Sequence, residues 1–137
     1  MCLFLSTPPL ELIANKNIVC YKFVDQKKID LHTLYQRQKV AIGNTYTSKL
    51  VMRKSPIADS SGYVVEQGLH SFASLRKLLK FLNPKEVNVY RANSNMPILC
   101  VAECIIPKGS RYYKGLFANC VSYASDKLHY VRIVEEY

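Results

Sequence analysis

The sequence predicts a single α+β domain, in which a mostly antiparallel or mixed sheet of about six strands carries one main helix on one face. Three observations lead to this expectation. The 137 residues suit one domain, 1–137, with residues 1–16 as an N-terminal extension. Hydrophobic residues make up 49% of the chain and charged residues 21%, which excludes a disordered chain. Short alternating segments surround one segment of helical periodicity, as expected when a helix covers a sheet.

The clearest predicted element is a helix at about residues 72–82. Apolar side chains recur there at helical spacing and form one stripe: Phe72, Leu75, Leu78, Leu79 and Leu82. Ser71 is the expected N-cap, because its hydroxyl can accept a hydrogen bond from a backbone amide of the first turn. Asn83 and Pro84 end the helix, since proline disfavours helical geometry in the residue before it. We therefore expect the leucine face to pack on the sheet.

Extended segments are predicted on both sides of this helix. Their ranges are 17–24, 40–48, 63–65, 86–92, 98–106, 110–117 and 128–134. Segment 98–106 is largely apolar on both faces, which predicts a central strand. Residues 53–62 have the composition of a loop, and residues 25–38 show no clear pattern. About six of the extended segments are expected to form the sheet.

The charge balance bears on the partners of the protein. Nineteen Lys and Arg residues oppose ten Asp and Glu residues, which gives a formal net charge of +9. Such an excess favours polyanions through phosphate contacts, but it equally keeps a small protein soluble. No apolar run approaches the roughly 18 residues of a membrane span, so no membrane association is expected.

The five cysteines predict reduced thiols. Their number is odd, and the N-terminal segment MCLFLSTPPL lacks the basic region of a secretory signal. We therefore expect a cytoplasmic protein. Cys100 and Cys104 lie four positions apart on an expected strand, which places them too far apart to hold one metal ion unaided. No metal and no cofactor is expected.

Two segments hold the candidate ligand-binding residues. His70 lies directly before the expected helix, where the helix dipole favours its neutral, hydrogen-bonding form. The segment KGSRYYK interleaves three cations with two tyrosines, which can contact a phosphate backbone and stack on bases: Lys108, Arg111, Tyr112, Tyr113 and Lys114. Arg91 is a further candidate. A single site requires that His70, Arg91 and Tyr112 converge on one pocket.

Two residues were weighed as catalytic groups. If the initiator methionine is removed, Cys2 becomes the N-terminal residue, and its amine and thiol could act as base and nucleophile. His70 is the other candidate, but no Ser, Asp or Glu is placed by the sequence to complete a triad with it. No catalytic residue is therefore assigned, and Cys2 is expected to be dispensable.

Several short motifs follow one another in a distinctive order. They are Gly43-x-x-Tyr46-x-Ser48, Gly68-x-His70-x-Phe72, Ile106-Pro107-Lys108-Gly109-Ser110-x-Tyr112-Tyr113-x-Gly115 and Tyr123-Ala124-Ser125. This order resembles a group of small bacterial and phage proteins without an established activity. The resemblance covers residues 17–134 and implies a single domain in a bacterial or phage cytoplasm. It carries over no functional residue.

These observations favour a small, basic, non-enzymatic binding or accessory domain whose ligand is a protein or a small anion. The expected surface combines the junction at 68–72 with the loop at 108–115. The first alternative is a nucleic-acid-binding module that uses the same basic residues. The second is a small hydrolase or transferase that uses Cys2 or His70. The oligomeric state stays open.

Overall fold

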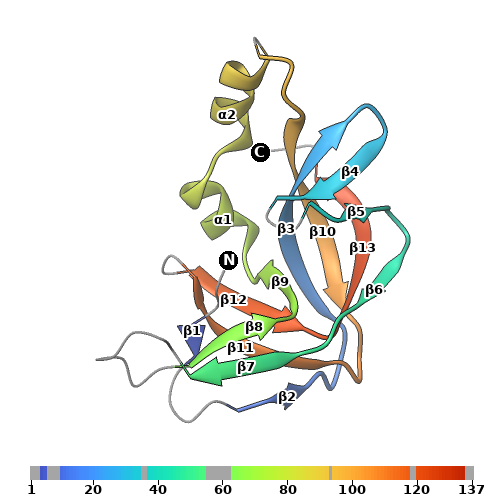
Figure 1. Cartoon of the computed structure of the whole chain (residues 1–137), viewed down its shortest axis with the longest axis vertical. Coiled ribbons are helices and arrows are strands. Elements are labelled where there is room, and N and C mark those ends of the chain that lie inside the picture. Colours follow the sequence, from blue (N-terminus) through green and yellow to red (C-terminus); the bar gives the residue numbers. More distant parts are fainter. Residues whose placement is uncertain are drawn as a thin grey trace.

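The chain forms one strongly curved antiparallel sheet with two short helices beside it (Figure 1). The computed structural model describes residues 4–5, 10–34, 37–54, 63–92, 94–117 and 120–134. The strands are β1 (Phe4–Leu5), β2 (Leu12–Ile13), β3 (Ile18–Lys27), β4 (Asp30–Thr33), β5 (Lys39–Val40), β6 (Thr45–Thr47), β7 (Val51–Lys54), β8 (Tyr63–Gln67), β9 (Leu69–Phe72), β10 (Ile98–Ile106), β11 (Arg111–Phe117), β12 (Cys120–Ser125) and β13 (Lys127–Val134). The helices are α1 (Leu75–Phe81) and α2 (Pro84–Arg91).

The sheet curls because two stretches of the chain, β8–β9 and β6–β7, each supply strands to two separate parts of the sheet. Its strand order is β6-β13-β10-β3-β9-β12-β11-β1-β8-β7, with β2, β4 and β5 attached at the sides. β8 and β9 are separated only by Gly68, yet β8 pairs with β1 and β7 while β9 pairs with β12 and β3. β6 and β7 are consecutive in the chain, yet they occupy opposite ends of the strand order. In Figure 1, β3, β10 and β13 run along the long axis, whereas β7 and β8 run across it.

The long strands β3, β10 and β13 form the centre of the fold. β10 pairs with β3 from Ile98 to Ile106 and with β13 on its other side, which confirms the predicted central strand at 98–106. Alternate residues of β10 fill both faces, because the strand is covered on both sides. Cys104 lies opposite Cys20 of β3 and Tyr130 of β13 in this register. These three buried side chains therefore lie on one face of the sheet.

The two faces of the central strands carry separate hydrophobic clusters. The first fills the concave side of the sheet: Ala14, Cys20, Val24, Leu31, Val40, Cys100, Ala102, Cys104, Ile106, Leu128 and Tyr130. The second lies between the sheet and the helices: Phe23, Phe72, Leu78, Leu99, Val101, Cys120 and Val134. Leu78 of α1 is fully buried in the second cluster, so the leucine face of this helix packs on the sheet.

The expectation of about six strands with one main helix is wrong. The described residues form a 13-stranded sheet and two short helices, so the protein is mostly β. The prediction missed β12, and it also missed strands of two to four residues, such as β2 and β4. Such strands are too short to show an alternating pattern, and they form because long neighbouring strands supply their hydrogen-bond partners. β1 and β2 lie in the segment expected to be an N-terminal extension, and both pair with β11.

The predicted helix begins later than expected. Residues 69–72 form β9, in which Ser71 is buried opposite Tyr123 of β12 and does not cap the helix. Ser74 is the N-cap, and its side chain accepts a hydrogen bond from the backbone amide of Lys77. Phe72 belongs to the apolar stripe but reaches the same cluster from the sheet. The cross-strand pairing therefore takes priority over the local helical periodicity.

A strand was predicted at 86–92, but residues 86–91 belong to α2 and Ala92 is its C-cap. Asn83 caps the N-terminus of α2 by accepting a hydrogen bond from the Lys85 amide, and Pro84 occupies its first turn. Proline is favourable at this position because the first helical amides have no intrahelical partner. The Asn83-Pro84 pair thus both ends α1 and begins α2. Of the loop predicted at 53–62, residues 53 and 54 belong to β7, and 55–62 lie outside the described residues.

The previously unassigned segment 25–38 contributes a hairpin. β3 continues to Lys27 and turns through Lys28 and Ile29 into β4, with Lys27 opposite Asp30. Lys28 has a positive φ of 57°, a conformation that glycine adopts more readily. In the described part of the chain, neither helix has the length and apolar character needed to cross a membrane.

Candidate functional site

A cavity of about 270 Å³ opens between β3, β9 and the C-terminal end of α1. It lies where β3 and β9 diverge after their contact at Tyr21 and Phe72. The residues that line it come from both hydrophobic clusters and the loops beside them: Lys22, Phe23, Thr33, Leu34, Gln38, Glu66, Gly68, Leu69, His70, Phe72, Phe81, Leu82, Phe117 and Tyr130. The cavity therefore joins an apolar region to a small polar one.

The apolar region is a chain of four phenylalanine rings. Phe72 packs edge-on against Phe23, with ring centroids 6.3 Å apart, and against Phe117, at 5.9 Å. Phe117 in turn packs against Phe81 of α1 at 5.9 Å. Edge-to-face packing at these distances is favourable beyond the area it buries. The rings give the cavity a firm wall suited to an apolar group.

Lys22 is the cation of the polar region. It follows Cys20 and precedes Val24 on the concave face of β3, and it lies opposite Ala102 of β10, whose small side chain leaves room for it. Its ammonium group donates a hydrogen bond of 2.8 Å to the backbone carbonyl of His70. No ion pair joins it to a carboxylate of the described residues. Burial of the ammonium lowers the pKa of Lys22 to about 8.

His70 supplies a second polar group to the same cavity. Its buried Nε2 atom has no hydrogen-bond partner among the described residues. Burial, followed by the nearby positive charge of Lys22, lowers the pKa of His70 to about 4, although a hydrogen bond to the Gly68 carbonyl opposes the fall. The ring is therefore neutral at neutral pH. Since Nε2 has no partner, we assign the contact with Gly68 to Nδ1, which leaves a lone pair on Nε2.

Gly68 makes the geometry of this region possible. A Cβ atom at this position would lie 3.0 Å from Cδ1 of Leu50 and 3.4 Å from Cβ of Ala124. A side chain at this position would therefore press against Leu50 and Ala124, so glycine suits the close packing between β8 and β9. The sequence signal for this close approach is Gly68 itself, because a glycine next to a strand pattern often marks a bend or a close backbone approach.

The two thiols and the phenol beside Lys22 are neutral. Burial raises the pKa of Cys20 to about 11 and raises the pKa values of Cys104 and Tyr130 well above their ordinary values. The thiols and the phenol therefore keep their protons at neutral pH. They cannot act as counter-ions for Lys22. Glu66 also lines the cavity, but no ion pair joins its carboxylate to Lys22.

The predicted ligand-binding residues do not share one location. His70 lines the cavity, whereas Arg91 and Tyr112 do not. Lys108, Arg111 and Lys114 are exposed in and beside β11. Tyr113 is buried in a small hydrophobic cluster, and Tyr112 packs edge-on against Tyr123 with ring centroids 5.8 Å apart. The two tyrosines thus contribute to packing, and nucleic-acid binding through this segment stays a prediction.

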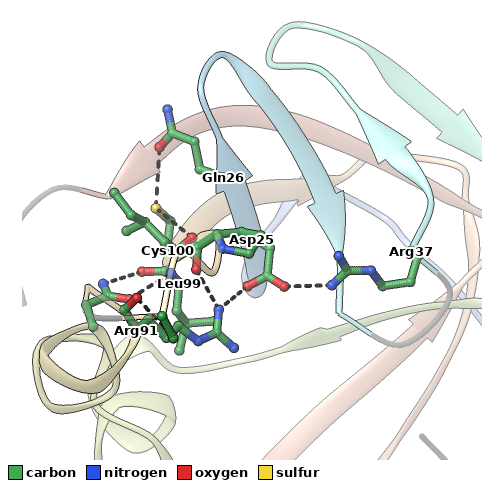
Figure 2. A network of polar contacts seen from close by, with 10 residues as sticks. Asp25, Gln26, Arg37, Arg91, Leu99 and Cys100 are labelled. Carbon is green, nitrogen blue, oxygen red and sulfur yellow. Dashed lines mark hydrogen bonds and ion pairs between the residues drawn. The ribbon is translucent and has the colours of Figure 1, made fainter.

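Arg91 belongs to a separate polar network that joins α2 to the sheet (Figure 2). Its Nη1 atom bonds Oδ1 of the buried Asp25 at 2.5 Å and the Pro97 carbonyl at 3.0 Å. Arg37 bonds the other carboxylate oxygen at 2.8 Å. Asn88 of α2 bonds both the amide and the carbonyl of Leu99, at 2.9 and 3.0 Å. The described part of β13 pairs with β10 from Val101 onward, and not at Leu99. The Asn88 side chain therefore makes the backbone hydrogen bonds of Leu99 that a neighbouring strand would otherwise make.

Sequence reasoning missed Lys22, although a signal for it was present. In the strand NIVCYKFV it is the one charged residue, and it shares a face with Cys20 and Val24. Period-two alternation therefore places an ammonium group among buried side chains. Cys2, the other proposed reactive group, lies outside the described residues.

Comparisons with known proteins add no family or function. The chain matches no protein-family model, no curated protein and no solved structure. Within the described ranges, no group of three or more His, Cys, Asp or Glu side chains could hold a metal ion. The functional argument therefore rests on the cavity and on two of its polar lining residues, Lys22 and His70.

Proposed function

We propose that this protein binds a small organic carboxylate with an apolar body in the cavity that Lys22 and His70 line. The observation that carries the proposal is a lysine that reaches a largely apolar cavity with one backbone carbonyl as its hydrogen-bond partner. An ammonium group has three N–H donors, so two remain for a ligand. A basic domain that holds a small anion was one of the functions expected from the composition.

Charge supports an anionic ligand. A buried cation without a counter-ion is unfavourable, and a carboxylate placed beside it relieves this cost. Hydrogen bonds between charged partners contribute about 1.5–3 kcal/mol each, which corresponds to roughly ten- to hundredfold in affinity. The bound carboxylate also raises the pKa of Lys22 again. Binding is therefore accompanied by proton uptake near pH 8 and weakens as the pH rises further.

Size and shape support a small ligand. Pockets for drug-sized ligands span about 300–1,000 Å³, and this cavity, at about 270 Å³, lies just below that range. The phenylalanine wall accommodates an alkyl or aryl group, and the lone pair on Nε2 of His70 can accept a hydrogen bond from a hydroxyl or N–H group of the ligand. A short-chain or aryl carboxylate satisfies both ends of the cavity.

Titration calorimetry at pH 7 with matched ligands tests the proposal. Hexanoate and 3-phenylpropanoate should bind, and hexanamide, which keeps the chain but lacks the charge, should bind at least about tenfold more weakly. Lys22→Met should abolish the preference for the acid. Lys77→Met, which removes an exposed lysine of α1, is the matched control and should bind like the parent.

Two results would overturn the proposal. One is equal affinity of the parent protein for hexanoate and hexanamide, which needs no variant. The other is unchanged hexanoate binding by a folded Lys22→Met protein.

A further inference from the structure

We infer that Lys22 is a covalent site at which small oxo acids condense with the side-chain amine to form an imine. The inference deepens the proposed function and rests on it, because the same cavity must admit the ligand. Its geometric basis is a lysine side chain that lines a largely apolar cavity and forms no ion pair with a described carboxylate.

The surroundings of Lys22 favour the nucleophilic form of the amine. A carboxylate partner would hold the amine protonated, but Lys22 forms no ion pair with a described carboxylate. The neighbouring Cys20, Cys104 and Tyr130 side chains keep their protons, so they carry no negative charge that would stabilise the ammonium form. With its pKa lowered to about 8, an appreciable share of Lys22 is neutral near neutral pH. Desolvated lysines in apolar pockets are activated in this way for reaction with carbonyl groups.

The reaction balances without a further reactant. The neutral Nζ atom adds to the carbonyl carbon, so a C–N bond forms and the carbonyl electron pair moves to oxygen. A proton passes from nitrogen to that oxygen, giving a carbinolamine. Loss of the hydroxyl group as water, with a second proton from the nitrogen, leaves the C=N bond. One amine and one carbonyl compound thus yield one imine and one water.

The cavity also accounts for the choice of an oxo acid. The imine nitrogen then takes up a proton from water and carries a positive charge at the position of the ammonium group. The adjacent carboxylate of a 2-oxo acid therefore retains its counter-ion. Nε2 of His70, which has no partner, can accept a hydrogen bond from the carbinolamine hydroxyl. The alkyl chain then lies against the phenylalanine rings.

Reductive trapping tests the inference. The parent protein is incubated with 2-oxohexanoate and sodium cyanoborohydride, which reduces the imine to a stable secondary amine. We expect an intact mass increase of one adduct and its location at Lys22 by peptide mapping. Hexanoate, which fits the same cavity but has no carbonyl group, should suppress this adduct by competition. Lys22→Arg removes the nucleophilic amine and should give no adduct at this position. Lys77→Met, which lies outside the cavity, is the control and should give the same adduct at Lys22 as the parent.

The outcomes separate the inference from the proposed function. Adducts confined to exposed lysines such as Lys77, with hexanoate still bound, overturn the imine site and leave carboxylate binding intact. If neither 2-oxohexanoate nor hexanoate binds, both are overturned. Peptide mapping of the parent protein decides the matter even if the Lys22→Arg variant does not fold.

Discussion

Replacing Asp25 by asparagine should destabilise the protein by about 3 kcal/mol. Asp25 is 4% exposed and holds two arginines, one on each carboxylate oxygen. Arg91 is largely buried, with 20% of its side chain exposed, and breaking a buried pair of this kind costs about 3–5 kcal/mol. Arg91 keeps its bond to the Pro97 carbonyl, which places the expected loss at the lower end. Arg37 is 58% exposed and adds less than about 1 kcal/mol.

Urea unfolding measures this loss. The midpoint should fall with an unchanged slope, and the melting temperature should drop by roughly 10 °C. Arg37→Gln is the matched control, because it removes the exposed partner alone and should cost less than about 1 kcal/mol. A double-mutant cycle between Asp25→Asn and Arg91→Met should give a coupling free energy within the range of about 0.5–3 kcal/mol seen for contacting residues.

The reasoning would be refuted by a small loss at Asp25 together with zero coupling to Arg91. That result would mean that α2 is held by Asn88 and by apolar packing, and that the arginines contribute little. A large loss with coupling to Arg37 instead of Arg91 would equally contradict the assignment, because the exposed pair would then dominate.

Three further predictions concern the core, the histidine and the thiols. Leu78→Ala should lower the free energy of unfolding in urea by about 2–5 kcal/mol, because Leu78 is fully buried. Leu79→Ala should lower it less, because Leu79 is half-buried. Equally small losses at both positions would show that α1 does not pack on the sheet. His70 binds a proton below about pH 6.5 in the unfolded chain but only below about pH 4 in the folded protein, so the free energy of unfolding should fall by up to about 1.4 kcal/mol per pH unit from pH 6.5 to 4. The His70→Gln variant should lack this loss of stability. Identical pH profiles of the parent and the variant would contradict the prediction. A thiol reagent should react with all five thiols in denaturant but leave four buried cysteines unmodified in the native protein: Cys20, Cys100, Cys104 and Cys120. Fast reaction at any of these four in the native protein would contradict their burial.

The elements that the sequence predicts correctly are those with a long regular pattern. The segment at 98–106 is apolar on both faces for nine residues, and only a central strand buries both faces. The leucines of α1 likewise repeat often enough to fix their face. By contrast, 86–92 was predicted as a strand because its residues alternate, but seven residues are too few to exclude a helix. Pro84 was interpreted only as the end of the preceding helix, although it begins α2. A two-residue strand such as β5 has no pattern of its own.

The candidate site was predictable in part. His70 is found in the cavity, but the reason given for it was a helix N-terminus that the structure places four residues further on, at Ser74. The cavity itself depends on the divergence of β3 and β9 after a single cross-strand contact, which is a property of the tertiary fold. Alternation alone could reveal the burial of Lys22. The partner of its ammonium group could not be found in this way, because His70 is 48 residues distant in the chain.

The pairing of β3 with β10 has a consequence for synthesis on the ribosome. Ile18 lies opposite Ile106, so one of the most apolar strands emerges long before its partner has been translated. At about 5–20 residues per second, β3 waits several seconds for β10 and longer for β13. During that interval its unpaired backbone and apolar side chains resemble the segments that chaperones shield. The curved sheet can therefore close only after nearly the whole described chain has left the exit tunnel. Nascent chains stalled before residue 98 should be sensitive to protease over residues 18–23 of β3, which do not pair with β4.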